Sequence, residues 1–159
     1  MQVDLTEKGK QDAANAGKLL HNVPFEKIYS SDLIRAMHTA EISLPNCAYE
    51  TTPLLREFNV GSLQGLPPAG ISVKNRDFTP YGGENREMLR ARVLEFLHQI
   101  EAQNATTVAA FSHAGWLRMM LSVVLGVEIP HSAIICANCT VAIFEYKDGI
   151  WSLHSWINP

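Results

Sequence analysis

Short apolar runs alternate along the chain with longer segments in which apolar residues recur every three or four positions. Short runs are typical of buried strands, and the wider spacing is typical of amphipathic helices. The clearest helical pattern consists of Leu89, Val93, Phe96, Leu97 and Ile100. The predicted helices cover residues 6–20, 32–43, 84–102 and 116–126, and the predicted strands end at residue 29 or cover 48–51, 107–111, 140–146 and 150–157.

The first predicted helix has Thr6 as its cap and an apolar stripe on one face. That stripe consists of Ala13, Ala16, Leu19 and Leu20. We expect these four residues to face the interior together.

The order of the elements predicts an α/β fold. Strands that alternate with helices favour a mostly parallel sheet with helices on both faces, a three-layer α/β/α sandwich. The last two strands flank Lys147-Asp148-Gly149, a turn sequence that predicts a C-terminal hairpin. Residues 56–83 are rich in Pro and Gly and predict a loop. The length of 159 residues, without repeats, suits one domain over residues 1–159.

Composition excludes several classes of protein. The net charge is −3 and there is no basic block, so nothing indicates a nucleic-acid partner. No apolar run approaches the ~18 residues that a membrane span needs, and the N-terminus lacks a signal-peptide pattern. Cys136 and Cys139 form a lone C-x-x-C, which could be redox-active or half of a zinc site. Without a second pair, small buried thiols are favoured, and reduced thiols suit a cytoplasmic protein.

Ser112-His113-Ala114-Gly115 is the strongest candidate for a site. It follows an apolar strand that ends at Phe111 and precedes an apolar helix. Ligands of open α/β sheets bind at the carboxyl ends of strands, and a helix N-terminus favours an anion such as phosphate. The alternative is that His113 is a structural histidine.

Arg35 is a second candidate, near the start of the helix after the strand that ends at Tyr29. Ser31 or Asp32 would cap this helix. A cation is unfavourable near a helix N-terminus unless it reaches across the sheet edge to hold an anion bidentately. A solvated Arg on a helix face is the alternative.

Glu57 is a third candidate. It lies between apolar neighbours in Leu55-Arg56-Glu57-Phe58-Asn59-Val60-Gly61, where a carboxyl group could act as a general acid. The alternative is an exposed Glu57 that pairs with Arg56.

These segments, in this order, resemble the histidine phosphatase superfamily, which includes the cofactor-dependent phosphoglycerate mutases. The matching motifs are Asp4-Leu5-Thr6-Glu7-Lys8-Gly9, Ser30-Ser31-Asp32-Leu33 with Arg35, Leu55-Arg56-Glu57, Gly82-Gly83-Glu84 and Ser112-His113-Ala114-Gly115. Each motif is weak alone, but five in the family's order are specific.

The resemblance implies phosphomonoester hydrolysis through a phosphohistidine. Arg35 and His113 would bind the phosphoryl group, and Glu57 would protonate the leaving oxygen and later activate water. The resembled chemistry uses no metal, and we expect no cofactor for this chain. The expected partner is a small phosphorylated metabolite or inorganic phosphate, and the chain could form a homo-oligomer. The short segment 56–83 favours a phosphatase over a mutase.

One family motif has no counterpart in this sequence. The family's nucleophile belongs to an Arg-His-Gly motif at the end of a first strand, and no such motif occurs in residues 1–159. We therefore expect this domain to be N-terminally incomplete, without that strand, and its activity to be in doubt. In the family the strand lies between those predicted here at 107–111 and 140–146. Unpaired neighbours predict poor folding unless they pair directly or a partner donates a strand.

None of the other histidines replaces that nucleophile by its spacing. They are His21, His38, His98, His131 and His154. For each of them a structural or solvent-facing role is favoured.

Two other functions remain as alternatives. A non-catalytic relative would keep a phosphate site at Arg35 and His113. A serine hydrolase would use Ser112 in a degraded G-x-S-x-G elbow, where both glycines are replaced by Ala110 and Ala114. Separately, Lys74 and Arg76 could contact a second anionic group, although solvated loop residues are the default interpretation.

Overall fold

The structure is a computed structural model that describes residues 3–66, 76–130 and 133–159. Its elements are α1 (Glu7–Leu20), β1 (Lys27–Ser31), α2 (Ile34–Ser43), β2 (Glu50–Thr52), η1 (Pro53–Leu55), η2 (Gly61–Leu63), η4 (Thr79–Tyr81), α3 (Arg86–Glu101), β3 (Val108–Phe111), α4 (Ala114–Leu125), β4 (Val141–Lys147) and β5 (Ile150–Ile157). The predicted elements are all present in this region, with ends displaced by a few residues.

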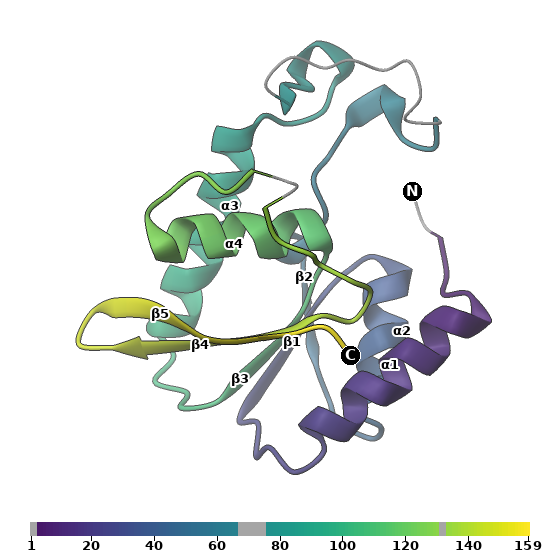
Figure 1. The fold of residues 1–159 in the computed structure, drawn as a ribbon, viewed down its shortest axis with the longest axis vertical. Helices are drawn as coiled ribbons and strands as arrows, with labels where there is room; N and C mark the ends of the chain where they lie inside the picture. The colour runs from purple at the N-terminus through teal and green to yellow at the C-terminus, as the bar shows by residue number, and fades with distance from the viewer. Residues whose placement is uncertain (1–2, 67–75, 131–132) are drawn as a thin grey trace.

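The first three strands form a parallel sheet in the order β2-β1-β3. The central strand β1 is the most buried, because Tyr29, Ser30 and Ser31 are each at most 1% exposed. Helices α1 and α2 lie on one side of the strands, and α3 and α4 lie on the other (Figure 1). The predicted α/β class with a mostly parallel sheet is therefore confirmed.

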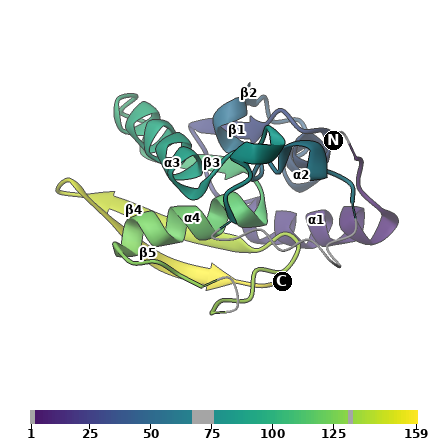
Figure 2. The same cartoon turned by 90° about the horizontal axis from the view of Figure 1, so that it is seen from above.

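The predicted C-terminal hairpin is also confirmed. β4 and β5 pair antiparallel from Val141↔Ile157 to Lys147↔Ile150, with one irregularity after Ile143. Asp148 and Gly149 at the turn both have positive φ, which is the backbone of a type I′ turn. The hairpin lies beside α4 (Figure 2). Its Trp151 packs against the core.

The two sheets do not join within the described part of the chain. There, β3 pairs only with β1, and β4 pairs only with β5. Direct pairing of β3 with β4 was one way in which the expected folding defect could be avoided, and the described strands do not use it. That defect remains a prediction.

The core lies between the parallel sheet and helices α3 and α4. Phe96 packs edge-to-face against both Tyr29 and Trp116, with ring centroids 5.6 and 5.7 Å away. The predicted apolar stripe of α3 is buried, except for Ile100, which is partly buried at the margin. Edge-to-face rings add about 0.5–1.5 kcal/mol each beyond the area that they bury.

The packing of α1 corrects the predicted stripe. Ala13, Ala16 and Gly17 are buried, whereas Leu19 is 47% exposed. A Cβ on Gly17 would lie 2.6 Å from the Ser43 carbonyl oxygen, so α1 approaches α2 through small residues. Leu19, two positions after Gly17, lies off this face.

No helix in the described ranges is both long and apolar enough to cross a membrane.

Candidate active site

The candidate residues meet beside the carboxyl ends of β1 and β3. Ser31 ends β1, and His113 follows β3 and is the N-cap residue of α4. Parallel pairing places Ser30 beside Phe111, so the two strands end at the same edge of the sheet. The predicted juxtaposition of the α2 and α4 segments follows from this register.

Arg35 and His113 contact each other directly. Arg35 Nε donates to His113 Nδ1 at 3.2 Å. His113 Nε2 lies 2.9 Å from Ser31 Oγ, and because Nδ1 already accepts a hydrogen bond, the neutral ring carries its proton on Nε2 and donates it to Ser31. Burial lowers the pKa of His113 to about 3, with help from the positive charges of Arg35 and Arg92 and against Asp32. The imidazole is therefore neutral and can donate a hydrogen bond to a phosphate oxygen.

The start of α2 corrects one prediction. The helix begins at Ile34, with Leu33 as N-cap residue and no side-chain cap, so neither Ser31 nor Asp32 caps it. Both side chains are engaged elsewhere. The Ser31 hydroxyl accepts from the Leu33 N–H at 3.3 Å and bonds His113, and Asp32 accepts two hydrogen bonds from Arg56.

Glu57 lies against the first turn of α4. Its carboxylate accepts the N–H of Phe58 at 2.8 Å and the N–H of Gly115 at 3.2 Å. A Cβ on Gly115 would be 2.3 Å from Glu57 Oε1, so only glycine allows this approach. The alternative of a Glu57–Arg56 pair is wrong, because Arg56 pairs with Asp32, and that pair lowers the pKa of Asp32.

Arg92 holds the Glu57 segment, and the sequence interpretation missed it. Its guanidinium donates to the backbone carbonyls of Leu54, Arg56 and Glu57 and pairs with buried Glu84 at 2.6 Å. Glu84 in turn accepts the Asn59 N–H at 2.8 Å. The Gly-Gly-Glu motif was a signal for Glu84, but Arg92 is one of several arginines on α3, and its spacing does not single it out.

Ser112 shows no arrangement of a nucleophile. Its hydroxyl donates to the Leu55 carbonyl at 2.7 Å, and the His113 ring is bonded to Arg35 and Ser31 instead. A serine nucleophile needs a neighbouring base. The described structure thus gives no support to the serine hydrolase alternative.

Three of the other histidines form side-chain hydrogen bonds away from the candidate residues. His38 bonds Asp4, His21 bonds the Lys18 carbonyl and His154 bonds Ser155, while His131 lies outside the described residues. These contacts agree with structural or solvent-facing roles.

Cys136 and Cys139 are free thiols ahead of β4 and are half-buried rather than buried. Burial raises the pKa of Cys139. Within the described ranges, no three His, Cys, Asp or Glu side chains are grouped so that they could hold a metal ion.

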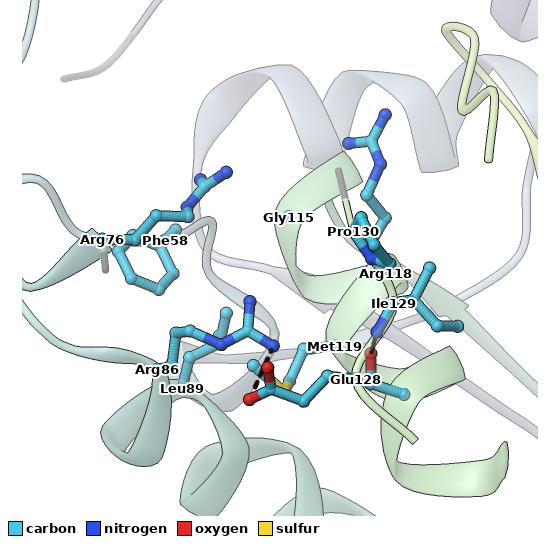
Figure 3. A pocket seen from close by; sticks show the side chains of 11 residues that line it. Phe58, Arg76, Arg86, Leu89, Gly115, Arg118, Met119, Glu128, Ile129 and Pro130 are labelled. Carbon is cyan, nitrogen blue, oxygen red and sulfur yellow. Dashed lines mark hydrogen bonds and ion pairs between the residues drawn. The ribbon is translucent and has the colours of Figure 1, made fainter. Parts of the chain in front are cut away.

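A pocket of about 370 Å³ adjoins Glu57 through Gly115. Three arginines line it, Arg76, Arg86 and Arg118, and Figure 3 shows Gly115 between Arg76 and Arg118 in the view. Arg76 was a candidate for a second anion contact, whereas Lys74 lies outside the described residues.

In this α/β fold an arginine, a neutral histidine and a carboxylate gather at strand ends and a helix N-terminus, which is the kind of place where anions bind in such folds. A sequence model of the histidine phosphatase superfamily (branch 1) matches residues 1–159, and the chain belongs to this family.

Two relatives illustrate the range of the family. The chain is 32% identical to a metal-independent phosphoserine phosphatase of Arabidopsis thaliana over 98% of this chain and 71% of that protein. It is 37% identical to the fructose-2,6-bisphosphatase TIGAR B of Danio rerio over 60% of this chain, and this match spans only 42% of the relative's length.

Solved structures agree on the fold. The phosphoserine phosphatase of Entamoeba histolytica, in complex with 3-phosphoglyceric acid, superposes with a TM-score of 0.84 at 20% identity, covering 100% of this chain and 86% of that one. A mycobacterial glucosyl-3-phosphoglycerate phosphatase superposes with a TM-score of 0.81 at 25% identity, covering 98% of this chain and 87% of that one.

Proposed function

We propose that this protein hydrolyses a small phosphomonoester, with Arg35 and His113 binding the phosphoryl group and Glu57 transferring a proton. The observation that carries the proposal is the direct Arg35–His113 hydrogen bond at the same helix start where Gly115 holds the Glu57 carboxylate. Positioning and charge stabilisation at the phosphoryl oxygens are what phosphoryl transfer requires.

The roles follow from the donors that each group offers. The Arg35 guanidinium can donate two parallel hydrogen bonds to phosphate oxygens. Neutral His113 donates from Nε2, which in the structure bonds Ser31. Protonated Glu57 would give its proton to the leaving oxygen, and the resulting carboxylate would accept a proton from attacking water, so the net reaction is ester plus water to alcohol plus phosphate.

The attacking nucleophile is not assigned to any residue in 1–159. The resemblance implies a phosphohistidine, but the sequence contains no Arg-His-Gly motif. The second candidate is a relative that binds phosphate without turning over an ester, and it rests on the Arg35–His113 hydrogen bond alone.

Hydrolysis is favoured over phosphoryl shift between two positions of one substrate. The short segment 56–83 carries this preference. The relatives include phosphatases for phosphoserine and fructose 2,6-bisphosphate as well as probable phosphoglycerate mutases. We extend the proposal to small phosphorylated metabolites as substrates, and to the cytoplasm as location because all three cysteines are free.

The test combines turnover with binding. Phosphate release from a panel of phosphomonoesters and calorimetric binding of inorganic phosphate are measured on the protein and on Arg35→Ala. Turnover together with Arg35-dependent binding supports hydrolysis. Binding without turnover supports the second candidate, and absence of both overturns the proposed site.

A further inference from the structure

We propose that Arg92 and Glu84 form a positioning pair that fixes the Glu57 carboxylate against the first turn of α4. This inference deepens the proposed function and rests on it, because it takes Glu57 as the group that transfers a proton. Neither Arg92 nor Glu84 is assigned a proton or a phosphate oxygen. Both act through Glu57.

The chain that carries Glu57 runs from the end of η1 to the start of η2 and belongs to no described α-helix or strand. Its carbonyl groups therefore need partners outside a helix or a sheet ladder. Side chains of other segments supply them. The Leu55 carbonyl accepts from the Ser112 hydroxyl at 2.7 Å, and the Leu54 carbonyl accepts from the Trp116 indole at 2.8 Å. Side-chain contacts thus decide where this segment lies.

Arg92 contributes the largest share of these contacts. Its Nη1 donates to the carbonyls of Leu54 at 2.9 Å and Arg56 at 3.1 Å, and its Nη2 reaches the Glu57 carbonyl at 3.4 Å. Three carbonyls within four residues converge on one guanidinium group. A lysine ammonium is a single point donor and cannot reproduce this fork.

Glu84 orients the guanidinium group from its other edge. Glu84 Oε1 accepts from Arg92 Nη2 at 2.6 Å and Oε2 accepts from Nε at 3.1 Å, which is a bidentate pair. The same Oε1 accepts the Asn59 N–H at 2.8 Å, and the Glu84 N–H donates to the Asn59 carbonyl at 2.9 Å. The pair therefore holds the chain on both sides of Glu57.

The Glu57 side chain extends from this bracketed backbone to α4. Its carboxylate accepts the Phe58 N–H and, at 3.2 Å, the Gly115 N–H. Gly115 lies in the first turn of α4, where a backbone N–H has no acceptor within the helix. The state of the Gly115 amide therefore reports whether the carboxylate is in place.

The burial of the pair bears on what it contributes. Glu84 is buried and Arg92 is largely buried, and desolvation offsets much of the attraction between buried charges. Since both partners also bond the chain beside Glu57, we expect the loss of the fork to change the position of the carboxylate more than the stability of the fold.

The first experiment measures that position without requiring turnover. Arg92→Lys keeps the charge but loses the fork, and Arg90→Lys, at an exposed position of the same helix, is the matched control. Hydrogen exchange followed by NMR should show the Gly115 amide exchanging about tenfold faster in Arg92→Lys only, because a hydrogen bond to a charged acceptor is weakened. The amide of Tyr29 in β1 should be unchanged in both variants.

The second experiment measures the use of the proton. Hydrolysis of phenyl phosphate needs a proton on the leaving oxygen far more than hydrolysis of p-nitrophenyl phosphate does. In Arg92→Lys, kcat for phenyl phosphate should fall about tenfold or more, with a much smaller fall for p-nitrophenyl phosphate and unchanged KM for both. A purely structural role would lower both rates equally.

The outcomes separate this inference from the proposed function. Unchanged Gly115 exchange in Arg92→Lys overturns the inference, and so does faster exchange that is equal at Gly115 and Tyr29. If Arg92→Lys does not fold, Glu84→Gln decides by the same readouts, and failure of both variants to fold makes the pair structural and overturns the inference. Failure of inorganic phosphate to bind overturns the proposed function, whereas the exchange comparison still decides whether the pair positions Glu57.

Discussion

The Arg35–His113 cluster and the arginine pocket both adjoin the first turns of α4, but they differ in how their polar groups are paired. In the cluster, both ring nitrogens of His113 have partners, and Ser31 is completely buried. In the pocket, Arg118 Nε has no partner within the described residues, and Arg86 has only an exposed one. The polar groups of the cluster are therefore paired with one another, whereas the pocket keeps a buried donor that the described residues do not pair.

This difference bears on the phosphoryl end of a substrate. A preorganised group reaches its working geometry without a conformational cost at the moment of reaction, which suits the phosphoryl end. A buried donor without a partner is unfavourable, which the paired groups of the cluster avoid. Variants of the cluster should therefore change rate or phosphate affinity for every substrate.

The largest expected effect comes from Glu57→Gln. Gln keeps an oxygen for the Gly115 N–H but cannot donate an acidic proton, so the rate of phosphomonoester hydrolysis should fall about 10²–10⁴-fold. The affinity of Glu57→Gln for inorganic phosphate should equal that of the unmodified protein. The exposed Glu95→Gln on α3 is the control, and a Glu57→Gln variant with full activity would show that another group is the acid.

Arg35→Ala should weaken binding of inorganic phosphate by about 10- to 100-fold, because a charge-assisted hydrogen-bonding partner is removed. Calorimetry on the variant and on the exposed control Arg90→Ala measures this. Equal phosphate affinity in Arg35→Ala and the unmodified protein would mean that the cluster is structural.

Gly115→Ala should lower activity by about tenfold through Glu57. The added Cβ would displace the carboxylate from its position at 2.3 Å, and small misplacements of catalytic groups reduce rates strongly. Helix stability should not suffer, because alanine is the better helix former by roughly 0.5–1 kcal/mol. Gly9→Ala in α1 is the control, since its Cβ would meet its nearest neighbour at an ordinary 3.4 Å. Unchanged activity of Gly115→Ala would show that the reaction does not depend on the position of the Glu57 carboxylate.

The smallest expected effect is the response of His113 to pH. Its folded pKa of about 3 lies below the unperturbed 6.5, so the unfolded chain takes up the proton first as the pH falls. The stability that neutral His113 contributes is present above pH 6.5 and is lost as the pH falls toward 3. NMR signals of the ring should not titrate between pH 8 and 5, and an inflection near 6.5 would contradict the buried neutral ring.

The pH dependence of unfolding gives a second readout. His113→Gln should show a shallower loss of stability between pH 6.5 and 3 than the unmodified protein. His154→Gln, an exposed position of β5, is the control.

Most of the fold could be predicted from the sequence, because its signals are local. Apolar periodicity located α3, the Thr6 cap located α1, and Lys147-Asp148-Gly149 located the hairpin turn. The predicted helix ends were less accurate where a potential capping side chain has a partner in a distant segment. Asp32 could have capped α2, but in the structure it pairs with Arg56, 24 residues away.

The sequence by itself indicated the alternation of elements and the three candidate residues. Arg35 and His113 stand near a helix start and a strand end, and Glu57 lies between apolar neighbours in a loop. Only the tertiary structure decided which partners they have. The bonds from Arg35 to His113 and from Gly115 to Glu57 span 78 and 58 positions. The same is true of the Arg92 contacts and of the pocket formed by Arg76, Arg86 and Arg118. Contacts between distant segments depend on how sheet and helices pack, and no local spacing encodes them.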